Sequence, residues 1–172
     1  MTKLYKLTDK DGRTYGGCQW GEGVTHETDG HGELCGPGWI HAYTDPLLAV
    51  LLNPIHANFD PDTMLLWWCK GKVGRTDSGL KVGSTKVTTI RTIPGPEITT
   101  EQRVRFAILC AREVYQEPVW SQWAAAWLDG TERGASASAS ASAYAAADAA
   151  AYAAADLDLI SLARRAMEGE TK

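Results

Sequence analysis

Two cysteines and two histidines in the first part of the chain carry the side chains that bind zinc. Cys18, His26, His31 and Cys35 follow one another in the order C-x7-H-x4-H-x3-C. Thiolate sulfur and imidazole nitrogen are ordinary zinc ligands, but ligand pairs usually stand about two to four residues apart. Only His31 and Cys35 meet that spacing. The sequence therefore predicts no cofactor and no metal site, with zinc on these four residues as the alternative.

The segment CGPGWIHAYTDP holds a second group of residues that could do chemistry. Cys35 and His41 are a thiol and an imidazole, the pair that cysteine nucleophiles use, but no nucleophile motif surrounds them and we expect no catalytic residue. Trp39, His41 and Tyr43 alternate along a predicted strand and so share one face. Together with Trp20 they would form the walls of an aromatic ligand pocket. The alternative is that these aromatic residues belong to the core.

The segment GWIHAYTDPLLAVLL looks like the strand–Tyr/Thr–helix segment of ADP-ribosyltransferase-like folds. Such enzymes also need an Arg or His on the first strand and a glutamate on a late strand. Here Lys6 stands where the Arg or His would be expected, and Glu97 follows PGP. The resemblance implies a nucleotide-binding or ADP-ribosyltransferase-like domain, active or degenerate, as an alternative function, and the departures favour a degenerate one.

The elements that position these residues are β-strands in the first part of the chain. LYKLT, Trp39–Tyr43, Thr63–Val73 and Leu80–Ile93 are alternating or β-branched runs typical of strands. DKDG predicts a turn after the first strand, and GRTDSG predicts the turn between the last two. TDP, with Pro46 at the first helical position, predicts a short helix that the next NP ends.

Two helices are predicted to follow the strands. Thr99 and Gln102 fit a capping box, and apolar residues then recur at helical spacing. Pro118 opens the second helix, which Asp129–Gly130 ends. Strands followed by helices predict an α+β fold, with a small, mostly antiparallel sheet packed by two or three helices in a globular domain of residues 1–130.

Composition changes near Gly134, after which alanine dominates. Alanine is the best helix former, so residues 135–168 are predicted to form a long alanine-rich helical tail. Five residues recur at four-residue steps along this tail: Tyr144, Asp148, Tyr152, Asp156 and Ile160. An isolated alanine helix frays in water, so we expect the tail to pack on its own domain, on a second copy of the chain or on a partner protein.

The formal net charge of the chain is -4 over 172 residues. This acidic balance disfavours a dedicated nucleic-acid-binding protein, although it is compatible with a local basic patch. No run approaches the about 18–20 apolar residues of a membrane span, and the first residues lack the apolar core of a secretory signal. We therefore expect a cytoplasmic protein without a membrane partner, whose cysteines are free thiols.

The layout of the chain resembles a set of small, uncharacterised phage and prophage proteins. The resemblance rests on CGPGWIHA, with Cys35, Gly38 and His41, on a strand of the W-x-C-x-G type and on the alanine-repeat tail. The family brings no activity and no catalytic residue with it. It implies a phage accessory protein in the cytoplasm of an infected bacterium that acts by binding, as an inhibitor of a host defence system.

The expected partner is accordingly a host protein or a small nucleotide ligand. The tail would serve for self-association or partner contact, so we expect a homo-oligomer. Whether the chain is also an enzyme stays open at this point, and the lack of a complete catalytic motif favours a non-enzymatic role.

Overall fold

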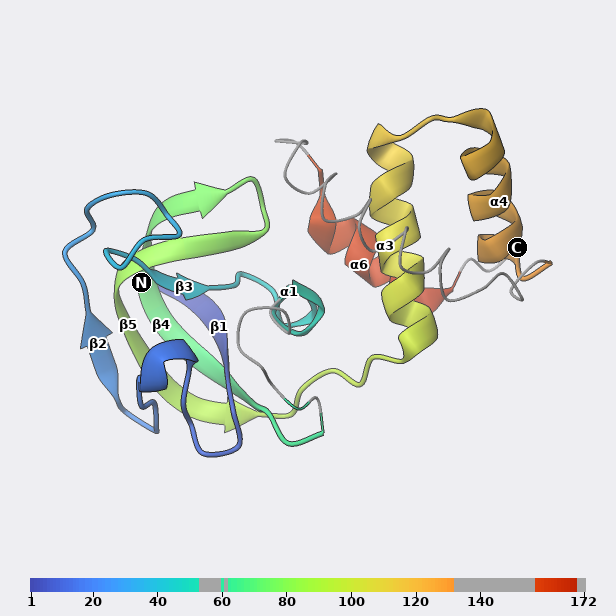
Figure 1. Cartoon of the computed structure of the whole chain (residues 1–172). Coiled ribbons are helices and arrows are strands. Elements are labelled where there is room, and N and C mark those ends of the chain that lie inside the picture. Colours follow the sequence, from blue (N-terminus) through green and yellow to red (C-terminus); the bar gives the residue numbers. More distant parts are fainter. Residues whose placement is uncertain (53–59, 61, 132–156, 170–172) are drawn as a thin grey trace. The chain divides into compact units, whose positions relative to one another are not determined.

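The structure is a computed structural model of the chain (Figure 1). It describes residues 1–52, 60, 62–131 and 157–169. The chain divides into two compact units, Met1–Glu97 and Ile98–Lys172, which we call the β unit and the helical unit. The division precedes the change in composition near Gly134, because the helices that follow Glu97 pack with the C-terminal segment.

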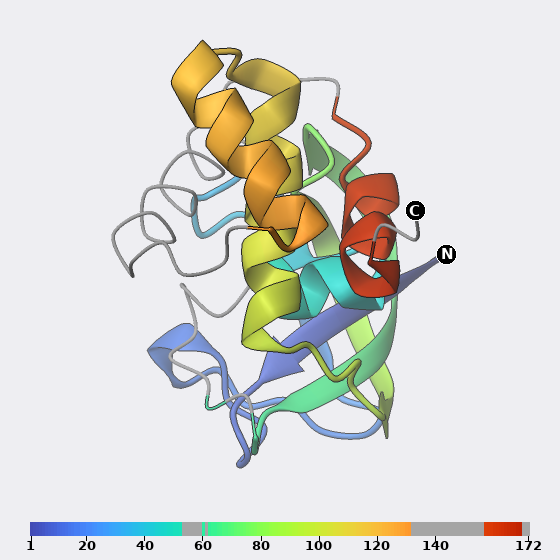
Figure 2. The same ribbon diagram turned by 90° about the vertical axis from the view of Figure 1, so that its right-hand side faces the viewer.

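The β unit contains an antiparallel sheet of five strands, which confirms the prediction of a small antiparallel sheet. The strands are β1 (Thr2–Thr8), β2 (Thr25–Glu27), β3 (Ile40–Ala42), β4 (Leu65–Asp77) and β5 (Lys81–Ile93). β4 pairs with β1 on one side and with β5 on the other, and the far edge of β5 pairs with β3 and then with β2. Figure 2 shows the curvature of the long β4–β5 hairpin from a second side.

One bridge joins the ends of this curved sheet into a ring. Tyr5 of β1 and Tyr43, just beyond β3, exchange both backbone hydrogen bonds, with N–O distances of 2.8 and 2.9 Å. The pairing order is therefore β1–β4–β5–β3 and back to β1. Inside lies a core of buried residues: Leu4, Trp20, Ile40, Ala42, Trp67, Cys69, Val82 and Val87. Ring closure thus gives the strands an interior face and an outer face.

The glycine-rich loop before β3 folds back on the β4–β5 hairpin. A Cβ atom at Gly38 would lie 2.1 Å from the carbonyl oxygen of His31, so this position requires glycine. Trp39 lies on two further glycines, because Cβ atoms at Gly74 and Gly83 would come within 2.6 and 3.1 Å of its ring. Much of the CGPGWIHA segment therefore serves to pack the loop on the sheet.

The short helix α1 (Pro46–Leu52) follows β3, as TDP predicts. Asp45 Oδ1 accepts a hydrogen bond from Leu47 N at 2.8 Å and so caps the first turn. α1 packs against β1, and several of its apolar side chains are buried. The predicted stop at Asn53–Pro54 lies outside the described residues.

The turn of the β4–β5 hairpin comes later than the sequence predicts. β4 continues through Gly74 to Asp77. Ser78 and Gly79 then have positive φ angles of 42° and 85°, and the three residues 78–80 form the turn between the paired residues Asp77 and Lys81. The prediction of a turn beginning at Gly74 was wrong because this glycine makes room for the Trp39 ring within a paired strand.

The helical unit contains three helices within the described residues. They are α3 (Thr100–Val114), α4 (Pro118–Asp129) and α6 (Leu159–Glu168). The predicted capping box is present, since Gln102 N donates to Thr99 Oγ1 at 3.1 Å and Thr99 N donates to Gln102 Oε1 at 2.9 Å. α4 begins at Pro118 and ends at Gly130, whose φ is 83°, as predicted. α3 packs against both α4 and α6 (Figure 1).

The helix α6 begins inside the predicted alanine-rich tail. Asp158 is its N-cap, with non-helical backbone angles, and accepts a hydrogen bond from Ser161 N at 3.0 Å. Gln102 Nε2 of α3 donates to Met167 O at 3.2 Å and ties the two helices together. Residues 157–158 are not helical, because the capping aspartate starts a new helix there. The predicted single helix over residues 135–168 is therefore interrupted at this point.

Candidate functional site

Trp20, the first of the predicted pocket residues, lies inside the ring. Its side chain is 3% exposed, and its Nε1–H donates to Thr14 Oγ1 at 3.2 Å. The imidazole of His26 meets the indole edge-on, with the ring centroids 4.5 Å apart. These are the contacts of a core residue, whose indole N–H has found an acceptor.

Trp39, His41 and Tyr43 lie across the sheet from Trp20. Ile40 and Ala42, on either side of His41, belong to the core. Because side chains alternate along a strand, Trp39, His41 and Tyr43 point to the outer face. The Nε1–H of Trp39 and the Nε2–H of His41 donate to carbonyl oxygens of the glycine-rich loop. Tyr43 is buried. This burial and, to a smaller extent, the nearby Asp77 carboxylate raise the pKa of its hydroxyl. The structure thus does not bring the four side chains together, and their binding role stays a prediction.

Two of the four residues that could bind zinc in the alternative interpretation of the sequence lie close together. Cys18 Sγ lies 3.6 Å from His26 Nε2, but the same nitrogen lies 2.8 Å from Gln19 O, a carbonyl to which it donates. A ligating imidazole nitrogen must carry no proton, so this hydrogen bond competes with metal binding. His31 and Cys35 are exposed. Within the described parts of the chain, no three His, Cys, Asp or Glu residues are grouped to hold a metal ion.

The predicted contact row of the tail is mostly beyond what the structure describes. Tyr144, Asp148, Tyr152 and Asp156 lie outside the described residues. Ile160 belongs to α6, where it is partly exposed. The proposed role of these residues in self-association or partner contact stays a prediction.

Lys6 points into the ring from β1. Its Nζ donates to His41 O at 3.0 Å and lies 4.8 Å from the centroid of the Trp20 ring. Desolvation by burial lowers the pKa of this ammonium to about 8, against the opposing effect of two nearby thiols. Glu97, the glutamate that the ADP-ribosyltransferase resemblance would pair with Lys6, is exposed at the end of the β unit. Lys6 is thereby engaged in the core rather than presented to a substrate.

The outer face of the same strands carries a second tryptophan, surrounded by cations. Trp68 on β4 pairs with Tyr5 on β1 and with Arg91 on β5. The charged groups of Lys3, Lys70 and Arg91 lie 5.8, 5.9 and 5.6 Å from the centroid of the Trp68 ring. Lys3 also lies 5.4 Å from the Tyr5 ring. We call these five residues the basic–aromatic face.

The cations of the basic–aromatic face differ from other basic residues of the sheet in their partners. Lys81 pairs with Asp77 at 3.2 Å, and Lys86 pairs with Glu27 at 2.5 Å. Among the described residues, the face's two lysines and its arginine have no carboxylate partner. Strands β1, β4 and β5 together carry eight Lys and Arg residues and a single carboxylate. Three of these cations, Lys3, Lys70 and Arg91, form a locally basic cluster around Trp68 in an acidic chain.

The basic–aromatic face was not among the sequence predictions, although part of its signal is visible in the sequence. K-x-Y in β1 and W-x-K in β4 each place a cation and an aromatic ring on the same side of a strand. The net charge of the whole chain is negative, so it does not reveal a cluster of three cations. Arg91 joins the face through the register of the β4–β5 pair, which the sequence does not show.

The Trp68 side chain also carries one polar group, its Nε1–H. This nitrogen is buried and has no hydrogen-bond acceptor among the described residues. Buried donors in proteins nearly always have a hydrogen-bond acceptor, so this unsatisfied donor is unusual. The face thus presents a π surface and three cations, and the Nε1–H of Trp68 is buried beneath it.

No protein-family model, curated protein or solved structure matches this chain. The resemblance to phage and prophage proteins therefore stays a prediction. Within the described residues, no helix is long and apolar enough to cross a membrane.

Proposed function

We propose that the protein acts by binding and that its basic–aromatic face holds a nucleotide, free or within a single strand of nucleic acid. The observation that carries this proposal is the set of three cations without carboxylate partners around Trp68. Aromatic rings stack on bases, and Lys and Arg bind phosphates. Apart from the Tyr5 hydroxyl, the five residues of the face offer only cations and aromatic rings, which suits binding.

The arrangement keeps its charge available for a ligand. Each cation placed near an exposed ring gains only about 0.5–1 kcal/mol, and this contact does not neutralise the charge. Lys3 and Lys70 offer compact ammonium charges, while Arg91 offers a planar fork that fits phosphate oxygens. Because Lys3, Lys70 and Arg91 come from three adjacent strands, the backbone register fixes their spacing around Trp68.

Fluorescence anisotropy with labelled single-stranded oligonucleotides tests the proposal. We expect affinity for a twelve-residue thymidine strand that falls with salt, with a slope of about −2, because each of three phosphate contacts contributes roughly −0.7. Trp68→Ala should weaken binding by about 1–3 kcal/mol, the value of one stacked base. Parallel titrations with AMP and ATP decide whether a free nucleotide suffices.

Two variants serve as matched controls. Trp39→Phe changes an indole that packs on glycines of the β4–β5 hairpin, and Lys10→Gln removes an exposed cation already paired with Asp11 at 2.9 Å. Both should bind like the wild type. Equal affinity of Trp68→Ala and wild type, or binding that does not respond to salt, would contradict the proposal.

The resemblance to phage proteins suggests a biological role for this binding, which we include in the proposal. A protein that binds nucleotides or a nucleic-acid strand without turning them over fits an inhibitor that withholds a signal or a substrate from a host defence system. Affinity capture from a bacterial lysate with wild type and Trp68→Ala tests it. A host protein retained equally by both would place the partner contact elsewhere. Light scattering of the full chain tests the predicted self-association.

A further inference from the structure

The outer face of β4 carries one more cation beyond the basic–aromatic face. Trp68, Lys70 and Lys72 follow one another in the pattern W-x-K-x-K. The residues between them point inward, because Cys69 is buried in the core and a Cβ atom at Gly71 would lie 2.9 Å from a core leucine side chain. Side chains alternate along a strand, so Lys72 lies on the same outer face as Trp68 and Lys70. We call these three residues the β4 row.

The pairing of β4 keeps this row regular. The register of β4 against β5 shifts twice between Trp68 and Val73, but both times the extra residue belongs to β5. Successive outward side chains of β4 therefore stand about 6.8 Å apart, twice the rise per residue of an antiparallel strand. Lys3 of β1 pairs with Lys70, and Arg91 of β5 pairs with Trp68. The neighbouring strands thus add a cation beside each of the first two positions of the row.

Lys72 is exposed, and no carboxylate in the described parts of the chain pairs with it. The cations that come next along the hairpin differ in this respect. Arg75 Nη1 lies 3.9 Å from Glu33 Oε2, and Lys86 Nζ lies 2.5 Å from Glu27 Oε1. Carboxylates repel phosphate groups, so the run of cations that can bind phosphate ends at Lys72.

The dimensions of the β4 row fit a chain of nucleotides better than a single one. The step of about 6.8 Å between Lys70 and Lys72 is close to the spacing of consecutive phosphates in an extended strand. Trp68, at one end, offers a ring on which an unpaired base stacks. A nucleoside monophosphate stacked there has one phosphate and reaches only the cations nearest the ring. Lys72 lies about 14 Å along β4 from Trp68 and needs a further phosphate.

We propose that the ligand is a single strand of nucleic acid, longer than a dinucleotide, that runs along β4 from Trp68 to Lys72. One base stacks on Trp68, and the phosphates contact Arg91, then Lys3 and Lys70, then Lys72. This inference rests on the proposed nucleotide binding by the basic–aromatic face and adds Lys72 as a binding residue. A fourth phosphate contact changes the salt slope of about −2 that the face alone would give to about −2.8.

The length of the ligand is the first test, with the full chain and fluorescence anisotropy. Unlabelled thymidine strands of two, four, six and twelve residues, AMP and a twelve-base-pair duplex compete with the labelled twelve-residue strand. We expect affinity to rise at least about tenfold from two to six residues, because each added phosphate contact contributes. The duplex should compete about tenfold more weakly than the twelve-residue strand, because its paired bases cannot stack on Trp68.

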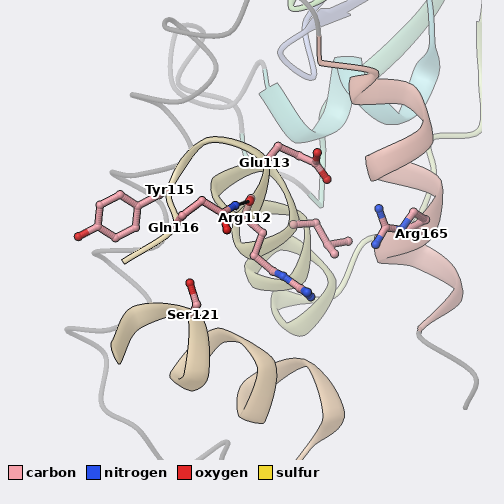
Figure 3. A pocket seen from close by; sticks show the side chains of 7 residues that line it. Arg112, Glu113, Tyr115, Gln116, Ser121 and Arg165 are labelled. Carbon is pink, nitrogen blue, oxygen red and sulfur yellow. Dashed lines mark hydrogen bonds between the residues drawn. The ribbon is translucent and has the colours of Figure 1, made fainter. Parts of the chain in front are cut away.

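Lys72→Gln tests the far end of the row. It should weaken binding of the twelve-residue strand about fivefold at 0.1 M salt and reduce the slope by about 0.7, while binding of the two-residue strand stays unchanged. Lys10→Gln is the matched lysine control. Arg112→Gln is a second control, because this exposed arginine lies in the helical unit, on the wall of a cavity of about 220 Å³ (Figure 3). Both controls should bind like the wild type.

The outcomes separate this inference from the proposed function on which it rests. Wild-type affinity in Trp68→Ala overturns both. Weakened binding in Trp68→Ala, together with AMP that binds as tightly as the twelve-residue strand, leaves the face as a site for a free nucleotide and overturns the extension along β4. Wild-type affinity and slope in Lys72→Gln, or equal affinity for strand and duplex, also overturns the extension.

Discussion

Lys6 with Trp20 and Lys3 with Trp68 are the same chemical pair on the two faces of one strand, β1. Inside the ring, a single ammonium lies 4.8 Å from the buried indole and donates to a backbone carbonyl. Outside, three cations share one indole at 5.6–5.9 Å and have no carboxylate partner among the described residues. The inner pair is part of the core, and the outer pair is open to a ligand.

The difference shows that exposure, more than residue type, decides what such a pair does. Desolvation lowers the pKa of Lys6 to about 8, so its charge costs stability at neutral pH. Lys3 and Lys70 are exposed and keep their hydration, so their charges are available for phosphate at little cost to the fold. Lys3 and Lys6 are three residues apart but therefore differ in role: Lys6 is part of the core, and Lys3 is available to a ligand.

Truncating the two indoles should separate the faces most clearly. Trp20→Ala empties a buried site and should lower the free energy of unfolding by about 3–5 kcal/mol. Trp68→Ala removes a partly exposed ring and should cost about 1 kcal/mol. Urea denaturation followed by circular dichroism measures both, and equal losses would remove the distinction between core and binding face.

The pH dependence of stability should report Lys6. Its folded pKa of about 8 lies below the usual 10.5, so the unfolded chain binds more protons between these values and the free energy of unfolding rises with pH. Above about pH 9 the buried thiols Cys69 and Cys110, whose pKa values burial raises to about 12, act in the opposite direction. The gain due to Lys6 should total about 2 kcal/mol, after allowance for its partial exposure.

Lys6→Met should abolish the rise between pH 8 and 9, and Lys3→Met on the outer face should keep it. Denaturant midpoints measured at half-unit intervals of pH provide the comparison. A rise that persists in Lys6→Met would show that the interior ammonium is not the group that titrates.

A hydroxyl on the inner face should matter more than one at the exposed end of the same strand. Trp67 Nε1–H donates to the buried Thr8 Oγ1 at 2.9 Å. Thr8→Val leaves that donor without an acceptor and should cost about 1–2 kcal/mol. Thr2→Val, at an exposed position of β1, should change stability by less than about 0.5 kcal/mol. Similar costs at both positions would contradict a closed interior.

The smallest expected effect on stability lies on the basic–aromatic face. Lys70→Gln should change the free energy of unfolding by less than about 0.5 kcal/mol, because the side chain is exposed and has no ion-pair partner among the described residues. It should reduce the salt slope of oligonucleotide binding by about 0.7, the loss of one phosphate contact. Lys10→Gln is the control for both measurements. An unchanged slope would exclude Lys70 from the binding surface.

The sequence by itself determined the elements whose signals are local. Thr99 and Gln102 form the capping box, Asp45 caps α1, and Gly130 ends α4, because each of these contacts joins residues within one turn of the chain. The β-branched alternation of Leu80–Ile93 predicted one or two strands, and the structure has one, β5. Strands followed by helices were enough to predict the α+β class.

Only the tertiary structure decided where these elements meet. The Tyr5–Tyr43 bridge closes the ring, and the register of β4 against β1 and β5 puts Tyr5 and Arg91 beside Trp68. The same closure puts Lys6 and Trp20 inside and lowers the lysine's pKa. Residue types and local spacing do not contain this information, because cross-strand neighbours depend on pairings between segments far apart in the chain.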